Sequence, residues 1–205
     1  MPQPTFLNLD AAKQAAIRAA GLAEFARNGY AGASLTRLAR QLGIAKGSLY
    51  QYFARKEAFY AYLVEWAADT RTEALTDARA AADKDVFKWL GRYLRARVRF
   101  DVDHPLLSDF LLSAGREGSA EVAATARGPR VHDQADLHET LARYQKKEQL
   151  SKKVDAGTAA RLIATLADQL AGWVAADTNA DEEVTDEAIR KEVKQVVALL
   201  KRGMG

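Results

Sequence analysis

The 205-residue sequence contains no cysteine and only four prolines. The missing cysteines exclude disulfide bonds, thiol catalysis and cysteine-ligated metal sites. No apolar run reaches the roughly 18 residues that cross a bilayer, and no basic segment followed by an apolar stretch opens the chain. Sustained alternation of apolar and polar residues is also missing, whereas alanine-rich stretches dominate. We therefore expect an all-α protein that is soluble and cytoplasmic.

The charge is small in total but unevenly distributed. The formal net charge is +3, and residues 1–66 carry eight Lys/Arg against four Asp/Glu, while residues 67–205 carry 22 against 23. A basic N-terminal segment on a nearly neutral body is typical of a protein that meets a polyanion there. An ordinary solvated basic face would look the same, so charge alone does not assign a partner.

The N-terminal segment is predicted to fold as a helix-turn-helix. A first helix covers about residues 10–28 and ends at Gly29, which suits the left-handed conformation. A second helix begins at Ser34, a good N-cap, and ends near Gly43. A third helix of about two turns follows at residues 46–53. Two helices joined by a tight glycine-containing turn, the second of them short, form this motif.

The short third helix lies in the stretch "GIAKGSLYQYF", which is rich in hydrogen-bonding and aromatic groups. Helical spacing places Leu49 and Phe53 on one face, where we expect them to pack on the first two helices. The opposite side then carries Gly47, Tyr50 and Gln51, with Ser48 at its edge. We expect that side to enter a DNA major groove.

The rest of the chain is predicted to be helical with short breaks, and it contains no internal repeat. A long helix begins at Lys56 and leads out of the basic segment. Breaks are expected at His104-Pro105, residues 115–118, Gly128-Pro129, residues 151–154 and residues 177–181. The helices between them are expected at residues 86–102, 108–114, 119–126, 130–150, 156–176 and 185–201.

The segment from about Asp10 to Trp66 resembles the DNA-binding domain of the tetracycline-repressor (TetR) family. The similar features, in order, are "AEFARNGY", "SLTRLARQLGI", "KGSLYQYF" and "KEAF". The resemblance implies a homodimeric transcription factor, usually a repressor that binds a palindromic operator in double-stranded DNA. It also implies a helical C-terminal domain that dimerises and binds a small-molecule effector. The expected division is a helix-turn-helix domain at residues 1–55 and an effector and dimerisation domain at residues 56–205.

The same resemblance assigns DNA contacts to particular positions. Contacts to phosphate are expected from Ser34, Thr36, Arg37 and Lys56, and the base-reading edge from Lys46, Gly47, Ser48, Tyr50 and Gln51, with Tyr50 and Tyr52 also able to reach phosphate or sugar. The side-chain types suit these roles, since a glutamine can bond bidentately to adenine and a lysine can donate to guanine. Two positions depart from the family: Ala45 stands where a capping Ser or Thr is common, and Arg55 where a small polar cap is common. We expect the third helix to depend mainly on Leu49 and Phe53 for its position.

Two sets of residues are candidates for the functions of the C-terminal domain. The dimer interface expected from the family layout comprises Leu162, Leu166, Leu170, Ile189, Val193, Val197 and Leu200. Aromatic and polar groups that could line an effector pocket are Trp89, Tyr93, Arg97, Phe100, Phe110, Arg116, Asp168 and Trp173. Apolar stripes of this kind are equally what an ordinary core requires.

Other functions find less support in the sequence. "GIAKGS" has the wrong order for a phosphate-binding loop and follows no strand. His132, Asp136 and Glu139 share a helical face that could hold a metal, although most such faces are solvated surface. We expect no cofactor, no metal and no enzymatic activity. An architectural DNA-binding dimer without an effector is the alternative, ahead of a helical enzyme.

Overall fold

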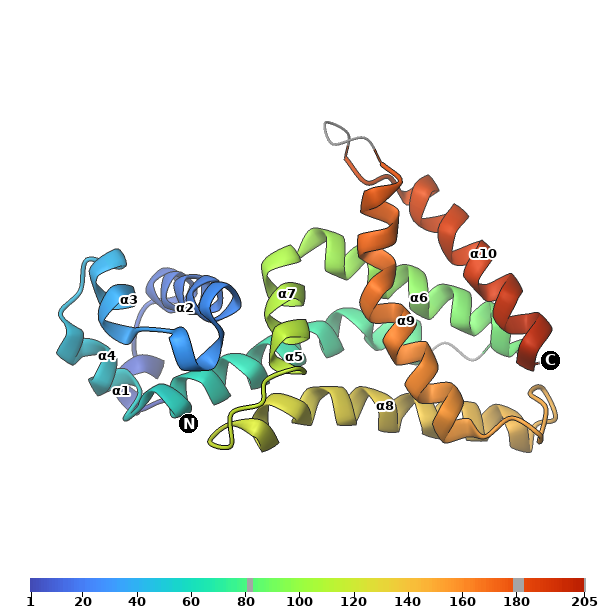
Figure 1. The fold of residues 1–205 in the computed structure, drawn as a ribbon, viewed down its shortest axis with the longest axis horizontal. Coiled ribbons are helices and arrows are strands. Elements are labelled where there is room, and N and C mark those ends of the chain that lie inside the picture. Colours follow the sequence, from blue (N-terminus) through green and yellow to red (C-terminus); the bar gives the residue numbers. More distant parts are fainter. Residues whose placement is uncertain (81–82, 179–182, 205) are drawn as a thin grey trace. The chain divides into compact units, whose positions relative to one another are not determined.

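The computed structural model describes residues 1–80, 83–178 and 183–204, and this part of the chain contains helices and turns but no strand (Figure 1). The expected all-α class is therefore confirmed. The ten helices of the described residues are α1 Pro4–Leu7, α2 Ala11–Gly32, α3 Leu35–Gln41, α4 Lys46–Tyr52, α5 Lys56–Ala80, α6 Val86–Asp103, α7 Pro105–Ala114, α8 Ala123–Lys146, α9 Ala156–Ala176 and α10 Asp186–Met204. None of these helices is long and apolar enough to cross a membrane.

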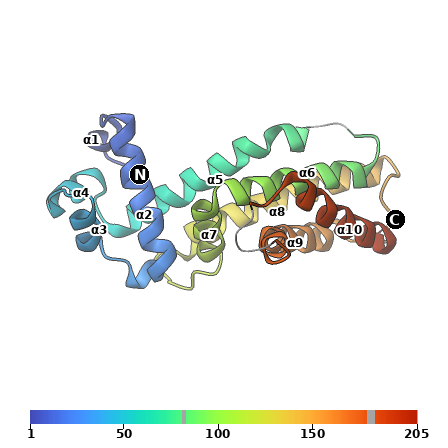
Figure 2. The ribbon, with the colours of Figure 1, turned by 90° about the horizontal axis from the view of Figure 1, so that it is seen from above.

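The helices form two compact units. Unit 1 comprises Met1–Thr70 and Pro105–Arg130, and unit 2 comprises Arg71–His104 and Val131–Gly205. Figure 2 shows α5 and α8 as long helices, and the unit bounds divide the residues of each between the two units. The expected boundary after residue 55 divides the chain by function and stays a prediction. By packing, the first part of α5 belongs with the helices that precede it.

Unit 1 has an aromatic core. Phe25 of α2 lies 5.9 Å from Phe59 and 5.0 Å from Tyr60 of α5, measured between ring centroids. Tyr60 in turn contacts Phe110 of α7 at 5.5 Å. Large rings of this kind bury much apolar surface each and stabilise a small unit efficiently. Glycine at position 21 permits the close approach of α2 to α5, since a Cβ there would lie 2.4 Å from Cζ of Phe59.

The helix caps follow the sequence closely at the start of unit 1. Asp10 caps α2 by accepting a hydrogen bond from the Lys13 amide at 2.8 Å. Gly29 has a φ of +63° and interrupts α2 where the first helix was expected to end. One further helical turn continues to Gly32 before α3 begins.

Helix α1 was not predicted. It has Pro4 in its first turn, where a missing amide hydrogen costs nothing. Phe6 is fully buried and lies 4.9 Å from the ring of Phe53. A four-residue helix is too short to leave a periodic signal, so only the proline could have indicated it.

The predicted break at Gly128-Pro129 is wrong, because α8 runs through Pro129 without ending. The two helices expected at residues 119–126 and 130–150 are therefore largely one. A proline inside a helix removes one backbone hydrogen bond. Buried Val122 and Ala126 before it, and Leu137 and Leu141 after it, anchor the segment on both sides. The break at His104-Pro105 is confirmed, with Pro105 as the first residue of α7.

Unit 2 is built from α6, α9, α10 and the adjoining parts of α5 and α8. Its core is contributed by side chains such as Trp89, Leu94, Ile163, Leu170 and Val193, all of them buried. Asp155 caps α9 through the Thr158 amide at 2.7 Å. The last two helices thus begin as the sequence predicts.

Candidate functional site

The helix-turn-helix consists of α3, a turn in which Gly43 has a φ of +65°, and α4. Leu49 and Phe53 are each 1% exposed, which confirms them as the anchors of α4. Phe53 lies 4.4 Å from the ring of Phe59 on α5. A two-turn helix is therefore held by its apolar side, and its other side is available for contact.

The outward side of α4 carries the groups expected to read DNA. Tyr50 is 44% exposed, and Lys46, Gly47 and Gln51 are exposed as well. The Lys46 ammonium lies 5.9 Å from the centre of the Tyr50 ring, so a cation and an aromatic face are presented together. Nothing lies within 4 Å of the position that a Cβ would take at residue 47. Ser48 is half-buried at the edge of this face.

The two ends of α4 are held differently. Ala45 occupies the N-cap and forms no side-chain hydrogen bond there, because alanine has no polar side-chain atom. At the C-terminal end the Thr5 hydroxyl donates to the Gln51 carbonyl, and the Gln3 amide donates to the Tyr52 carbonyl at 2.8 Å. The segment around α1 therefore satisfies carbonyl groups that a short helix leaves unpaired. Sequence reasoning missed this contribution.

Tyr52, the last residue of α4, also packs against the segment around α1. Its side chain is half-buried and its ring lies 6.2 Å from that of Phe6. An intramolecular role for Tyr52 is thus present beside the predicted contact to DNA.

A buried carboxylate ties α3 to α2. Ser34 caps α3 by accepting from the Arg37 amide at 3.3 Å, as predicted. Glu24, which is buried, accepts from the Ser34 amide at 2.7 Å and from Nε of Arg37 at 3.0 Å, and it also pairs with Nη2 of Arg37. Hydrogen bonding from Arg37 holds the pKa of the Glu24 carboxyl below its usual value. Arg37 therefore has a structural partner, and its contact to phosphate stays a prediction for the exposed edge of the guanidinium.

Lys56 also has a role inside the protein. Its Nζ donates to the carbonyls of Tyr30, Ala31 and Ala33 at 2.8, 3.3 and 3.2 Å. The ammonium lies 4.6 Å from the centre of the Tyr30 ring. An ammonium has three protons to donate, and all three have acceptors here. A phosphate contact by Lys56 stays a prediction and would require some of these bonds to be exchanged. Thr36, by contrast, is exposed.

Unit 2 contains a cavity of about 340 Å³. Trp89 and Tyr93 form one wall with nearly parallel rings, 5.6 Å apart at an angle of 9°. Burial raises the pKa of the Tyr93 phenol. The full lining comprises Thr76, Arg79, Ala80, Trp89, Tyr93, Asp136, Leu137, Glu139, Thr140 and Arg143. Only two of these ten belong to the predicted pocket, since the residues of α5 and α8 lacked an aromatic signal.

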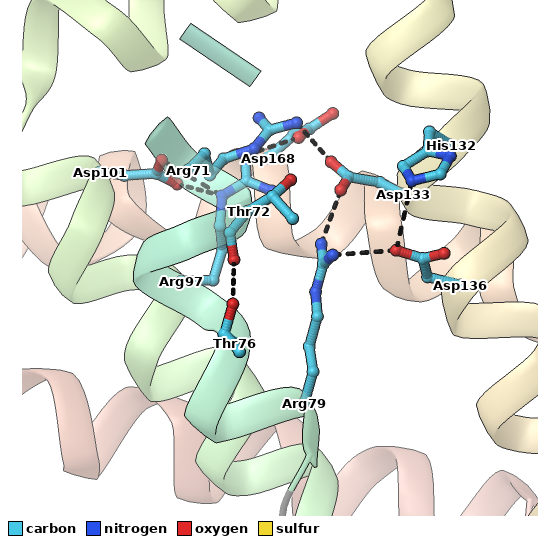
Figure 3. Close-up of polar contacts among 10 residues, drawn as sticks. All are labelled: Arg71, Thr72, Thr76, Arg79, Arg97, Asp101, His132, Asp133, Asp136 and Asp168. Carbon is cyan, nitrogen blue, oxygen red and sulfur yellow. Dashed lines mark hydrogen bonds and ion pairs between the residues drawn. The ribbon is translucent and has the colours of Figure 1, made fainter. Parts of the chain in front are cut away.

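Beside the cavity lies a network of buried ion pairs (Figure 3). Asp133 pairs with Arg71 and, at 2.7 Å, with Arg79, which also bonds to Asp136 at 2.9 Å. Burial lowers the pKa of Arg71, whose Nε has no hydrogen-bond partner among the described residues. The network fixes α5 against α8, and Arg79 and Asp136 also face the cavity.

Two predicted pocket residues belong to the neighbouring part of this network. Arg97 bonds to Asp101 at 2.9 Å and to Asp168 at 3.0 Å (Figure 3). Their charges thus pair with each other, and neither Arg97 nor Asp168 lines the cavity.

The remaining predicted pocket residues are dispersed. Phe100 is buried with its ring 4.8 Å from His104, and Trp173 is 42% exposed on α9. Phe110 is fully buried and Arg116 is exposed, both in unit 1. None of the four lines the cavity, because Phe100 and Phe110 are buried in the core, and Trp173 and Arg116 are exposed to solvent.

The metal site considered for α8 does not assemble. No group of three potential ligands comes together within the portion of the chain that the structure describes. His132 and Asp136 are 4.0 Å apart, and Asp136 is engaged by Arg79.

The predicted dimer residues divide between core and surface. Leu170, Ile189, Val193 and Leu200 are buried inside unit 2, so these side chains belong to the core instead of an exposed interface. Leu166 and Val197 are half-buried. Leu162, at 48% exposure, is the one predicted interface residue of the set that is classed as exposed. An apolar stripe alone could not tell which of its members face the chain's own core.

The buried anchors and the outward polar face of α4 define a helix-turn-helix DNA-binding protein. Residues 17–63 match the family described as "Bacterial regulatory proteins, tetR family". A TetR family transcriptional regulator from Chloroflexus aurantiacus has a similar structure, with a TM-score of 0.84, 28% identity, and coverage of 100% of this chain and 98% of that one. The expected resemblance is thus confirmed: residues 17–63 match the TetR-family model, and the whole chain shares its fold with a TetR-family regulator.

Two further solved structures share the fold at lower identity. The regulator FadR from Bacillus subtilis, in complex with stearoyl-CoA, has a TM-score of 0.70 and 20% identity, covering 91% of this chain and 96% of that one. AibR, in complex with isovaleryl coenzyme A and operator DNA, has a TM-score of 0.70 and 18% identity, covering 90% and 96%. No curated protein matches this sequence significantly.

Proposed function

We propose that this chain is a homodimeric repressor that reads a palindromic operator with α4 and releases it when a small molecule binds in unit 2. The observation that carries the proposal is α4 itself, anchored by Leu49 and Phe53 with Tyr50 and Gln51 directed outward. One helix of two turns reads few base pairs, so two copies on a near-palindrome supply the specificity.

Within the proposed interface, the roles follow from chemistry and exposure. Gln51 and Lys46 are exposed donors for base edges, and exposed Tyr50 can meet a thymine methyl or the backbone. Gly47 lets the DNA approach the helix backbone, because no side chain occupies that side. Ser34 and Thr36 at the start of α3 fix the register on phosphates.

Selection of bound genomic fragments, followed by footprinting, tests the DNA-binding part. We expect one discrete palindrome and an affinity that falls steeply as salt rises. Gln51→Ala is expected to cost about 1–3 kcal/mol, mainly at one base position. The exposed Gln195→Ala on α10 is the matched control and should leave affinity unchanged. An equal loss from Gln51→Ala on random DNA would refute a reading role.

The salt dependence also decides between the two roles of Lys56. If Lys56 contacts a phosphate, Lys56→Gln reduces the slope of log affinity against log salt by about 0.9. If its three carbonyl bonds are its only role, the slope stays the same and the stability of the protein falls instead.

The proposed dimer interface is narrower than the sequence suggested. On α9, Leu162, Leu166 and Trp173 follow helical spacing and retain exposed surface, and Leu199 of α10 is 67% exposed. Solvent-exposed large apolar side chains grouped on one helix face are typical of an interaction surface. Leu162→Glu with Trp173→Glu should yield a monomer in sedimentation, with unchanged circular dichroism and lost operator affinity. A double variant that stays dimeric would show that another surface pairs the subunits.

The cavity lined by Trp89, Tyr93, Arg79 and Arg143 is the proposed effector site. Its volume of about 340 Å³ and its four charged lining residues favour a small polar or aromatic molecule over a long acyl chain. Quenching of Trp89 fluorescence, measured by titration with a metabolite panel that includes isovaleryl-CoA and stearoyl-CoA, tests this reading. Trp89→Phe supplies the background signal of the other tryptophans.

Ligand binding in the cavity also distinguishes the proposed repressor from an architectural DNA-binding dimer. A ligand found by the titration should release the DNA, and Arg143→Gln or Glu139→Gln should change its affinity. An architectural DNA-binding dimer would bind without a preferred site and would respond to no ligand. We propose a regulator without catalysis, and turnover of any panel compound would contradict that part.

A further inference from the structure

A second, smaller groove lies between α6 and α10 of unit 2, which pack against each other. Its volume is about 260 Å³. Three arginines on α6 are spaced three and four residues apart and therefore share one helical face. The complete lining is Arg92, Arg95, Ala96 and Arg99 of α6 with Asp186, Ile189 and Arg190 of α10.

Two of the four arginines are held by carboxylates. Arg92 pairs with Asp83. Arg99 bonds to Asp103 through two nitrogens, at 3.1 and 2.6 Å, and approaches Asp186 at 3.5 Å. These partners hold the two guanidinium groups in place, and the Arg99–Asp103 pair is bidentate and therefore geometrically specific.

The other two arginines, Arg95 and Arg190, form no ion pair with any residue that the structure describes. Both are exposed and both line the same groove. The Arg95 guanidinium lies along its own helix beside Gly91, since a Cβ at position 91 would make an ordinary contact with Nη1 of Arg95 at 3.4 Å.

This concentration of positive charge is local. Residues 67–205 carry 22 basic against 23 acidic side chains, yet the groove has four guanidinium groups and one carboxylate in its lining. A mostly positive lining of a concave surface raises the local concentration of negatively charged ligands. The groove lies in unit 2, whereas the DNA-reading helix belongs to unit 1.

We infer that the groove between α6 and α10 binds a phosphate-bearing small molecule, with Arg95 and Arg190 as its direct ligands. A phosphate dianion matches two unpaired guanidinium groups in charge, and guanidinium matches phosphate in the geometry of its donors. Arg92 and Arg99 line the groove from fixed positions, with their charges offset by Asp83, Asp103 and Asp186. A carboxylate ligand carries one negative charge and would neutralise only one of the two guanidinium charges.

Phosphorus NMR with inorganic phosphate and inorganic pyrophosphate as probes tests the site on the full-length protein. Saturable line broadening is expected, stronger for pyrophosphate, and acetate should compete poorly. Arg95→Gln with Arg190→Gln should weaken binding at least tenfold. Arg161→Gln with Arg202→Gln removes two exposed charges elsewhere in unit 2 and should stay within twofold of the parent. Circular dichroism establishes that both double variants fold.

Two outcomes would overturn the inference. Equal weakening in both double variants, or broadening that never saturates, would show attraction to charge alone. A duplex-DNA titration separates the source of the phosphate, because a small-molecule site predicts equal DNA affinity for the two double variants. A tenfold loss of DNA affinity in the Arg95/Arg190 variant alone would assign the groove to the DNA backbone. That result would leave α4 as the proposed reading helix, which Gln51→Ala tests separately.

Discussion

Asp133 offers the sharpest test of the ion-pair network in unit 2. It is 7% exposed and joins Arg71 and Arg79, which approach it from α5. Asp133→Asn preserves the volume but removes the charge, so buried Arg71 loses its ion-pair partner. Breaking a buried pair in this way costs about 3–5 kcal/mol. Total stabilities are only about 5–15 kcal/mol, so the loss should be easily measured.

Urea unfolding followed by far-UV circular dichroism provides the assay. With a denaturant dependence of about 2 kcal/mol per molar, the unfolding midpoint should fall by roughly 1.5–2.5 M. Asp136→Asn is the matched control, because the Asp136 side chain is 37% exposed and its charged partners among the described residues are Arg79 and His132. Its effect should stay below about 1 kcal/mol, because the partial exposure of Asp136 lets water screen the Arg79–Asp136 pair.

A third variant separates lost charge pairing from lost packing. Arg71→Met with Asp133→Leu replaces both buried charges by apolar groups, and Arg79 keeps Asp136. Such replacements are often neutral or stabilising, so the double variant should be more stable than Asp133→Asn. If Asp133→Asn were no more destabilising than Asp136→Asn, the reasoning from buried charge would be refuted.

Three further predictions concern unit 1. Because hydrogen bonding from Arg37 lowers the pKa of Glu24 from its ordinary 4.5, the stability that wild type holds over Glu24→Gln should be constant above that pH. It should disappear as the pH falls through the lowered value, which urea unfolding across acidic pH would show. Gly21→Ala should cost about 1–3 kcal/mol by thermal unfolding, because its Cβ would collide with Phe59. Gly47→Ala should stabilise α4 by about 0.5–1 kcal/mol and yet weaken operator binding, and unchanged DNA affinity would contradict close backbone approach at this position.

Much of unit 1 could be predicted because its signals are local. The spacing of Leu49 and Phe53, the cap at Ser34 and the turn at Gly43 each act within a few residues, so the sequence pattern indicates the motif directly. The outward face of α4 follows from the same spacing, since whatever is not an anchor is exposed. Proline at residue 129 shows the limit of such signals: α8 continues because buried side chains on either side hold it.

The sequence by itself thus determined the helical class, the helix-turn-helix and the face of α4 that points outward. Only the tertiary structure decided that Lys56 caps α2, that Arg37 and Arg97 are held by carboxylates, and that Leu170 and Val193 belong to the core. The reason is that these contacts join residues far apart in the sequence. An apolar stripe indicates that a helix face is buried, but which helix covers that face depends on the packing of distant segments. Long charged side chains likewise pair with distant residues, as Arg71 does with Asp133, 62 positions away.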